Sequence, residues 1–451
     1  MTRPKLSWSD LAGARVGVWG MGREGHANLR KLVAMGVEPV LVDDHPKDES
    51  EGRPVLATGD GGLAALERCD VVVKTPGLSR HRPDVAHLSG LGIPVVGGLG
   101  LWLADAAEAD LRRVVCVTGT KGKSTTVSVI GHLLTGLGYR CLVGGNIGVV
   151  PYDPAEPGDF DYWAIEVSSY QATDLSCAPP VVAVTSLHPD HLDWHGGVEQ
   201  YYRDKLSLCS QPGAELTVAN GDSNLLAERA ALLGPRVEWV SAADDPGADW
   251  MEPLGLLGAH NRRNALIARR CLAALGVAGA RDDARLRAAA AGYRHLPSRL
   301  APIGTIGGVT FVDDSLSTNV LPTLAALDAL PGRRVALIVG GHDRGIDYRP
   351  LAAGVLARDA PTFVLTLPDS GPRIRAEMEQ AAAAAEPAFA GVTDCPDLDA
   401  AVASGFAWAR PDGVVLLSPA APSFGRFRDY RDRSEAFAHA VRAIPGHRVN
   451  P

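Results

Sequence analysis

Short apolar runs alternate with longer amphipathic stretches along the whole chain. One run, at residues 114–117, passes directly into a glycine-rich loop and then into a segment with the pattern of a helix. Runs of similar length lie at residues 15–19, 71–73, 93–96, 162–166, 181–185, 216–220, 309–312, 335–339, 362–367 and 414–417. Continuous apolar runs separated by helical stretches are typical of parallel strands that are buried on both faces. The pattern therefore predicts an α/β fold.

The length of 451 residues is too great for one hydrophobic core and favours about three domains. The order of the apolar runs predicts a Rossmann-like N-terminal domain over residues 1–108 and a central P-loop ATPase-type domain with a parallel sheet over residues 109–298. A C-terminal Rossmann-like α/β domain is expected over residues 299–451. Residues 281–292 and the alanine-rich residues 381–385 are expected to be helical.

Composition and charge narrow the function classes. The formal net charge is -8 and basic residues do not cluster along the chain, which argues against a nucleic-acid partner. The seven cysteines are dispersed without a CxxC pair, as is typical of reduced cysteines. We find no signal-peptide pattern and no apolar stretch of about 18 residues, so the sequence predicts a cytoplasmic enzyme without a membrane partner.

The sequence GTKGKSTT at residues 119–126 carries the strongest chemical signal. It follows a predicted strand and opens a predicted helix, which is the context of a P-loop. Glycines let main-chain N–H groups surround phosphate oxygens, Lys123 can reach the terminal phosphates, and Ser124 or Thr125 can hold Mg²⁺. The alternative is an ordinary glycine-rich turn between a strand and a helix. The flanking pattern favours a site for a nucleoside triphosphate.

A second glycine-rich loop, GMGREG at residues 20–25, follows the first apolar run. The next run ends in Asp43 and Asp44, about twenty residues further on, as in dinucleotide-binding units. The residues alone leave two interpretations open, an NAD site or a site for another nucleotide-linked ligand.

Polar residues at strand ends supply further candidates. Glu166 follows an apolar run, and a carboxylate beside a phosphate loop is suited to supply the oxygen ligand of a second magnesium site or of a metal-bridged phosphate. The alternative is a helix N-terminus capped by Ser168 or Ser169, and both interpretations can hold together. Asn261 and Asn264 open a helix and suit the edge of an adenine, although Asn261 is equally suited to cap that helix.

The sequence HPDHLDWH at residues 188–195 holds three histidines and two aspartates. A zinc hydrolase of the HxHxDH type needs a different spacing, because His188 and Asp190 stand where its two histidines belong. We expect His188 and His195 to be structural, while one histidine among aspartates is admissible as a magnesium ligand. Lys205, on the helix that follows, is expected from the residues alone to be an exposed lysine.

Five motifs occur in a fixed order along the chain. They are GTKGKST at residues 119–125, EVSSYQ at 166–171, DHLD at 190–193, GAHN at 258–261 with Asn264, and DDS at 313–315. Together they resemble the Mur ligases, which build the peptide stem of peptidoglycan. GGNIG at residues 144–148 and LSPAAPSFGRF at residues 417–427 resemble the branch that adds glutamate to UDP-N-acetylmuramoyl-L-alanine. The resemblance covers essentially the whole chain.

The resemblance implies an ATP-dependent ligase of cytoplasmic peptidoglycan precursor synthesis, and hence a role in cell shape and cell division. Lys123 would stabilise the phosphoryl group as it passes to the substrate carboxylate, giving an acyl phosphate that the amine of glutamate attacks. His191 and Lys205 would complete the catalytic set, and Lys205 matches a carbamylated lysine of the family. Two magnesium ions are expected on Ser124, Glu166, His191 and Lys205.

The resemblance also implies binding residues. The ATP set is Gly119, Thr120, Lys121, Gly122, Lys123, Ser124, Thr125, Asn261, Asn264, Arg299 and Asp314. The UDP-substrate set is Gly22, Arg23, Glu24, Gly77, Asn146, Ser168 and Gln171, so the GMGREG loop would not bind NAD. The glutamate set is Thr318, Arg344, Ser423 and Tyr430.

This chain departs from the family pattern mainly at the glutamate end. DSLSTN at residues 314–319 lacks the lysine of the family sequence Asp-Ser-Lys-Ala-Thr-Asn. GHDRG at residues 341–345 has Arg344 where the family has lysine, so a guanidinium that can form two parallel hydrogen bonds replaces an ammonium group. Tyr430 replaces a phenylalanine, and Ser298 replaces the histidine of Leu-Pro-His-Arg. The ATP-binding motifs are kept while the amino-acid pocket is changed.

Together with the GMGREG loop, these departures resemble a variant branch that adds L-glutamate and relies on a separate epimerase. Ligation of D-glutamate is the alternative within the branch, and folylpolyglutamate synthetase is the alternative within the ligases. An NAD-dependent oxidoreductase and a nucleotide-binding module without catalysis are the alternatives of other classes. A monomer is expected.

Overall fold

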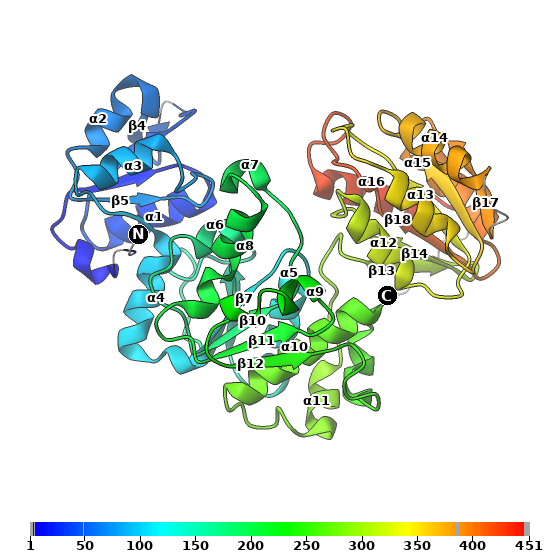
Figure 1. The fold of residues 1–451 in the computed structure, drawn as a ribbon, viewed down its shortest axis with the longest axis horizontal. Coiled ribbons are helices and arrows are strands. Elements are labelled where there is room, and N and C mark those ends of the chain that lie inside the picture. Colours follow the sequence, from blue (N-terminus) through cyan, green and yellow to red (C-terminus); the bar gives the residue numbers. More distant parts are fainter. Residues whose placement is uncertain (1–2, 4, 48, 384–387, 446–451) are drawn as a thin grey trace. The chain divides into compact units, whose positions relative to one another are not determined.

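The computed structural model describes residues 3, 5–47, 49–383 and 388–445. The chain divides into two compact units, one formed by Met1–Gly255 with Asn261–Tyr293 and the other by Leu256–His260 with Arg294–Pro451. The first unit contains two six-stranded sheets and the second contains one (Figure 1). Among the described residues, no helix is long and apolar enough to cross a membrane.

The N-terminal sheet has the strand order β3-β4-β2-β1-β5-β6, and all its pairings except β3 with β4 are parallel. Its strands are Val16–Trp19 (β1), Val40–Asp43 (β2), Glu49–Ser50 (β3), Arg53–Ala57 (β4), Val71–Lys74 (β5) and Val95–Gly97 (β6). Its helices are Arg23–Ala34 (α1), Leu63–Leu66 (α2), Pro83–Gly90 (α3) and Gly98–Ala109 (α4). Strands β1 and β5 are buried along their whole length, as the continuous apolar runs predict.

The central sheet has the order β12-β11-β10-β7-β9-β8 and is parallel throughout. Its strands are Val114–Thr118 (β7), Cys141–Gly145 (β8), Tyr162–Glu166 (β9), Val181–Val184 (β10), Leu216–Asn220 (β11) and Val237–Val240 (β12). Its helices are Lys123–Gly136 (α5), Ser169–Ala172 (α6), Leu192–His195 (α7), Val198–Leu206 (α8), Asn224–Ala227 (α9), Ala259–Ala274 (α10) and Asp283–Ala290 (α11). The chain leaves β7 to one side of the sheet and returns to its other side at β10. Open α/β sheets bind ligands at such a switch point, which here coincides with the P-loop.

The C-terminal sheet has the order β13-β14-β18-β15-β16-β17, with only β13 antiparallel to its neighbour. Its strands are Ala301–Ile306 (β13), Val309–Asp313 (β14), Val335–Val339 (β15), Thr362–Thr366 (β16), Phe389–Asp394 (β17) and Val414–Leu417 (β18). Its helices are Val320–Asp328 (α12), Arg349–Leu356 (α13), Gly371–Ala382 (α14), Leu398–Ala409 (α15) and Tyr430–Arg442 (α16). Alternate residues of β15 and β18 enter two different hydrophobic clusters, one with α12, α13 and α14 and the other with α15 and α16.

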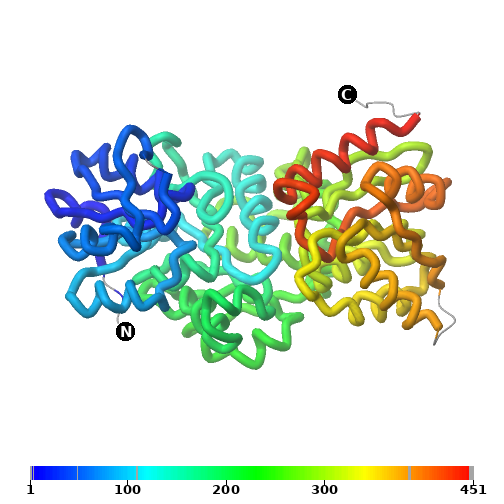
Figure 2. Tube along the Cα trace, turned by 90° about the horizontal axis from the view of Figure 1, so that it is seen from above, coloured from blue at the N-terminus to red at the C-terminus, as the bar shows by residue number. Residues whose placement is uncertain are grey.

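The predicted α/β class is confirmed, and each sheet consists of six strands that are consecutive in the chain. Figure 2 traces the same chain as a tube coloured by residue number. All of the predicted strands are present, and α11 lies within the helix predicted over residues 281–292. Of the predicted alanine-rich helix at residues 381–385, the first two residues end α14, whereas residues 384–387 lie outside the described residues. The domain boundaries after residues 108 and 298 stay predictions.

Candidate active site

The P-loop depends on two glycines with left-handed backbone. Gly119 has φ 136° and Gly122 has φ 89°, a region that other residues rarely adopt. A Cβ atom at Gly119 would collide with Thr185 Oγ1, and one at Gly122 would lie 2.9 Å from Asn264 Oδ1. Glycine is therefore required at both positions for the loop to pass from β7 into α5.

The residues that follow β10 hold the P-loop in place. Thr120 N donates to Ser186 O at 2.9 Å, and Lys121 N donates to Ser186 Oγ at 2.8 Å. Thr185 Oγ1 donates to Lys121 O at 2.6 Å, and Thr120 Oγ1 lies 2.8 Å from the hydroxyl of Tyr201. These bonds fix the main chain of the loop between β7 and α5.

Lys123 is the first residue of α5, and its side chain lies over the loop. Its Nζ donates to Gly119 O at 2.8 Å and to Thr120 O at 3.1 Å. The ammonium group is thereby held at the positive end of a helix, where an anionic phosphate is favoured. Thr125 is half-buried in the first turn of the same helix.

Glu166 at the end of β9 is buried next to the P-loop. Ser124 Oγ donates to Glu166 Oε2 at 2.6 Å, and Asn146 Nδ2 donates to Glu166 Oε1 at 2.8 Å. A hydroxyl and a carboxylate in contact form an oxygen donor pair of the type that Mg²⁺ prefers. Ser168 also caps α6 in a capping box with Gln171, so the helix-cap alternative and the position of Glu166 beside the loop hold together.

Lys205 is buried, and the expectation of an exposed lysine is wrong. Only 2% of Lys205 is exposed, and its Nζ donates to Gly119 O at 3.0 Å and lies 5.1 Å from the ring centre of Tyr201. Burial, reinforced by the charge of Lys123, lowers the pKa of Lys205 well below its ordinary value. Tyr201 and Lys205 are one helical turn apart on α8, so an aromatic residue at i−4 was the available sequence signal for burial.

The three histidines of residues 188–195 have different environments. His188 bonds to Thr120 Oγ1 through its main chain, and His195 is buried with its Nδ1 2.7 Å from Asp204 Oδ2. His191 has a left-handed φ of 50°, and its half-exposed ring lies 5.0 Å from that of Tyr170. Burial lowers the pKa of His191 despite the nearby Asp190 carboxylate. The histidines therefore do not form the metal set of a zinc hydrolase.

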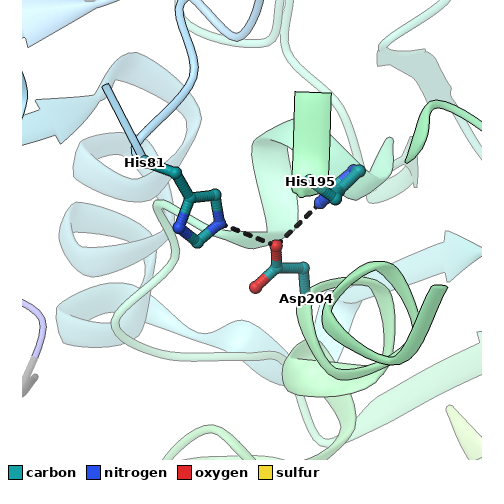
Figure 3. A group of neighbouring side chains, drawn as sticks. All are labelled: His81, His195 and Asp204. Carbon is teal, nitrogen blue, oxygen red and sulfur yellow. Dashed lines mark hydrogen bonds and ion pairs between the residues drawn. The ribbon is translucent and has the colours of Figure 1, made fainter. Parts of the chain in front are cut away.

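One group of three possible metal ligands occurs within the part of the chain that the structure describes. It consists of His81, His195 and Asp204, with ligand atoms all within 4.8 Å of one another (Figure 3). His81 follows β5 in the N-terminal sheet, whereas His195 and Asp204 belong to α7 and α8. Neither His188 nor His191 belongs to this group, which the sequence analysis missed because His81 is more than a hundred residues away.

The candidate UDP-substrate residues join the N-terminal and central sheets. Arg23 donates to Gly145 O at 2.7 Å, to Asn146 O at 2.9 Å and to Gly148 O at 3.1 Å. Gln171 Nε2 donates to Glu24 Oε1 at 2.7 Å. Burial raises the pKa of Glu24 to about 7.

Two further members of the candidate UDP-substrate set lie in loops. Gly77 O accepts from Trp194 Nε1 at 3.1 Å, which ties the loop after β5 to α7. Gly22 precedes α1 and is exposed. The set therefore comes from the loops and helix starts that follow β1, β5, β8 and β9, at the carboxyl ends of parallel strands.

The candidate adenine residues lie inside α10. That helix begins at Ala259, so Asn261 is its third residue and the helix-cap alternative is wrong. Asn264 Nδ2 donates to Asn261 Oδ1 at 3.2 Å, and Asn264 lies against Gly122 of the P-loop. Arg299 and Asp314 belong to the second unit.

Asp314 is buried at the end of β14. Ser317 Oγ and Ser418 Oγ donate to its Oδ2, and Leu300 N donates to its Oδ1 at 3.1 Å. Burial outweighs these three donors and raises the pKa of Asp314 to about 7. The carboxyl group thereby fixes three loops of the C-terminal unit.

The four candidate glutamate residues follow three neighbouring strands of the C-terminal sheet. Thr318 follows β14, Arg344 follows β15, and Ser423 and Tyr430 follow β18. Arg344 is exposed, Thr318 and Tyr430 are half-buried, and Ser423 is buried. Three adjacent parallel strands thus bring their carboxyl-end loops to one edge of the sheet.

Arg433 on α16 connects these loops, and the sequence analysis missed it. Its guanidinium is buried, and its Nη2 donates to Ser315 O at 2.9 Å and to Ala421 O at 3.1 Å. Nη1 donates to Ala421 O at 3.1 Å and lies beside Gly341. Burial lowers the pKa of Arg433 to about 10.

Two family descriptions match this chain. The Mur ligase middle domain matches residues 117–253, and the Mur ligase glutamate ligase domain matches residues 298–421. The chain therefore belongs to the Mur ligase family and is an ATP-dependent ligase.

Its relatives include enzymes named UDP-N-acetylmuramoyl-L-alanine--L-glutamate ligase. The one from a Micromonospora species is 44% identical and covers 97% of this chain and 99% of its own. Those from Salinispora tropica and Xanthomonas euvesicatoria are 42% and 38% identical, each over 97% of this chain and over 99% and 98% of their own lengths.

Solved structures of Mur ligases share the fold. A UDP-N-acetylmuramate-alanine ligase from Thermotoga maritima aligns with a TM-score of 0.56 over 95% of this chain and 99% of that chain, at 17% identity. A MurF ligase from the same organism, solved with ADP, aligns with a TM-score of 0.53 over 98% of both chains, at 14% identity. At these identities the likeness shows the shared fold.

Proposed function

We propose that this enzyme joins L-glutamate to UDP-N-acetylmuramoyl-L-alanine while converting ATP to ADP and phosphate, as a step of peptidoglycan precursor synthesis. The observation that carries the proposal is the 44% identity, over 97% of the chain, to a relative whose name states this ligation. The formed P-loop, with Lys123 at the start of α5, supports the ATP half of the reaction.

In the proposed reaction, an oxygen of the substrate carboxylate attacks the γ-phosphorus of ATP, and ADP leaves. The amine of glutamate then attacks the acyl carbon, loses a proton, and expels phosphate as the amide bond forms. Lys123 neutralises the charge of the phosphoryl group during transfer, a stabilisation that acts mainly in the transition state. Gly119 and Gly122 would hold the phosphates through main-chain N–H groups, while Thr120 and Lys121, whose N–H groups donate to Ser186, would shape the loop around them.

Ser124 and Glu166 would hold Mg²⁺. The fit rests on their chemistry, because a hydroxyl and a buried carboxylate 2.6 Å apart at a P-loop match the oxygen ligands of this ion. A magnesium ion supplies charge neutralisation for the phosphates. His191, half-exposed after β10, is proposed as a further ligand, and a second ion is proposed with Lys205.

Lys205 is proposed to be carbamylated. A neutral amine adds to CO₂ and releases one proton, which gives a carbamate with the charge and the oxygen atoms of a carboxylate. The lowered pKa of Lys205, caused by burial and by Lys123, favours the neutral amine that this addition needs. The carbamate would also replace an ammonium group that is unfavourable beside Lys123.

The substrate sets are proposed as the family resemblance implies them. Asn261, Asn264, Arg299, Asp314 and Thr125 would contact ATP. The UDP-linked substrate would lie along Gly22, Arg23, Glu24, Gly77, Asn146, Ser168 and Gln171.

Glutamate would bind through Thr318, Arg344, Ser423 and Tyr430. Arg344 can grip a carboxylate with two parallel N–H donors, which a lysine cannot do. Inverting the stereocentre while keeping the amine in line with the acyl phosphate requires new positions for both carboxylates of glutamate. The substituted residues at this end of the chain are therefore consistent with the L enantiomer named for the relatives.

Three further proposals follow from this assignment. A separate epimerase would invert the L-glutamate residue after ligation. The enzyme would act as a monomer in the cytoplasm, where its UDP-linked substrate is made. Conversion of the product by such an epimerase tests the first proposal, and the molar mass of the enzyme in solution tests the monomeric state.

The ligase assignment is tested by release of phosphate from purified enzyme with ATP and Mg²⁺. Phosphate release is expected only when UDP-N-acetylmuramoyl-L-alanine and glutamate are both present. NADH fluorescence on addition of the enzyme is expected to stay unchanged. Release with ATP alone at the same rate, or a saturating NADH signal, would contradict the assignment.

A further inference from the structure

The group His81, His195 and Asp204 joins two sheets at one carboxylate oxygen. His195 Nδ1 lies 2.7 Å from Asp204 Oδ2, and His81 Nε2 lies 3.0 Å from the same atom. In Figure 3 both imidazole rings direct a nitrogen toward this oxygen from opposite sides. Two imidazole nitrogens and one carboxylate oxygen within 4.8 Å of one another are a donor set typical of zinc sites that keep an open position.

We propose that His81 Nε2, His195 Nδ1 and Asp204 Oδ2 bind one zinc-class divalent cation, with water as the fourth ligand. Tetrahedral ligands about 2.0–2.1 Å from zinc are about 3.4 Å apart. The two observed distances are therefore within 1 Å of those that the ion needs. Binding would require rotation of the partly exposed His81 ring and a small turn of the carboxylate.

The groups that hydrogen-bond to the proposed ligands are placed as a metal site requires. A ligating histidine usually donates its other N–H to a fixed acceptor, and His195 Nε2 lies 3.0 Å from Ser169 Oγ. Gln200 Nε2 donates to Asp204 Oδ1 at 2.8 Å, which orients the carboxylate and leaves Oδ2 for the ion.

The three ligand side chains differ in how far they are exposed to solvent. The side chain of His195 is 0% exposed and that of Asp204 is 9% exposed, whereas that of His81 is 41% exposed. An ion can therefore reach the site past His81, and the buried side chains of His195 and Asp204 would replace most of its water ligands. Imidazole nitrogens favour zinc over magnesium, whereas the oxygen donors Ser124 and Glu166 favour magnesium. The two sites are therefore expected to prefer different metals.

The proposed cation would link the loop after β5 to α7 and α8. The same loop carries Gly77, whose carbonyl accepts from Trp194, and Asp204 precedes Lys205 in the chain. Binding would therefore brace the junction between the N-terminal and central sheets. It would do so independently of ATP, since the set contains none of the candidate ATP residues.

The test is calorimetric titration of metal-free, full-length enzyme with Zn²⁺ in the presence of excess Mg²⁺ and without nucleotide. Because His191 is also a possible zinc ligand, His191→Ala serves as the background for every variant. We expect one Zn²⁺ per chain and at least tenfold weaker binding after His81→Ala. His87→Ala is the matched control, since His87 is about half-exposed in the same sheet domain and pairs with Glu67 as His81 pairs with Asp204. It is expected to bind Zn²⁺ as the background does.

A second measurement separates ligation from folding. Zinc-edge X-ray absorption of the loaded background enzyme is expected to show two imidazole ligands in a four-coordinate shell of nitrogen and oxygen. Gln200→Ala is expected to weaken binding about 10–100-fold, the usual effect of removing an outer partner. Absence of Zn²⁺ binding in the background enzyme, equal affinity in His81→Ala, or a shell without imidazole would each overturn the proposal. Circular dichroism in zinc-free buffer must be the same for all variants.

Discussion

Substitution of Arg433 tests whether this residue positions the loops that carry the candidate glutamate-binding residues. The substitution Arg433→Met removes the guanidinium while keeping a long apolar side chain. It deletes three hydrogen bonds to two main-chain carbonyl groups, Ser315 O and Ala421 O. Hydrogen bonds from charged donors contribute about 1.5–3 kcal/mol each, but two of these share one acceptor, so the loss is about 3–5 kcal/mol.

The same substitution also removes the unfavourable free energy of burying a charged guanidinium, which is of similar size to the loss of hydrogen bonds. Burial lowers the pKa of Arg433 to about 10, a decrease that corresponds to about 3 kcal/mol against the buried charge. The two effects nearly cancel, as is common when a buried charged group is replaced by an apolar one. We therefore expect the free energy of unfolding to fall by no more than about 2 kcal/mol. The loops after β14 and β18 nevertheless lose their common anchor.

The expected consequence is a change in kinetics more than in stability. The KM for L-glutamate should rise at least about tenfold, equivalent to about 1.4 kcal/mol of lost positioning, while the KM values for ATP and the UDP-linked substrate change less than about twofold. Initial-rate measurements with one substrate varied at a time, together with thermal melts, provide the assay. Arg442→Met, on the exposed side of the same helix, should change neither quantity. An unchanged KM for glutamate in a folded Arg433→Met enzyme would refute the positioning role.

Three further predictions concern the other candidate residues. Lys123→Ala should reduce kcat about 10²- to 10³-fold in the phosphate-release assay, because one transition-state charge partner is lost, and near-normal turnover would contradict its role. Enzyme equilibrated with ¹³C-bicarbonate should give a carbamate carbon resonance that is absent in Lys205→Ala, and a resonance common to both would exclude Lys205 as its origin. The folded-state pKa of Glu24, about 7, lies above its ordinary value of 4.5, so the folded chain loses stability as the pH rises through this window. The melting temperature of Glu24→Gln should therefore increase relative to the native enzyme between pH 5 and pH 8, and a constant difference would show that Glu24 does not titrate there.

The fold was predictable wherever a strand is buried on both faces. The runs at β7, β10, β15 and β18 are apolar at almost every position, and their burial leaves little choice of structure. The missed strands, among them β4, β12 and β17, lie at or near sheet edges and mix exposed with half-buried residues. Their pairing is decided by neighbours far along the chain, which a local pattern does not record.

The local chemistry of the site was also predictable, but its long-range partners were not. GTKGKSTT indicates a P-loop by itself, because glycine, lysine and hydroxyl residues at these spacings have one common use. The contact of Ser124 with Glu166 joins residues 42 positions apart, and that of His81 with Asp204 joins residues 123 positions apart. Such contacts depend on the order of strands in the sheets. The same holds for Lys205, whose burial beside the P-loop requires α8 to lie next to the loop that follows β7.

The identity of the amino acid remains the central claim, and one measurement tests it directly. Purified enzyme is supplied with ATP, Mg²⁺ and UDP-N-acetylmuramoyl-L-alanine, with L-glutamate or D-glutamate offered separately. Chiral analysis of the hydrolysed product then identifies the enantiomer that was joined. The account predicts ligation of L-glutamate with a kcat/KM at least about 100-fold above that for D-glutamate, or about 2.7 kcal/mol of discrimination. A preference for D-glutamate would contradict it.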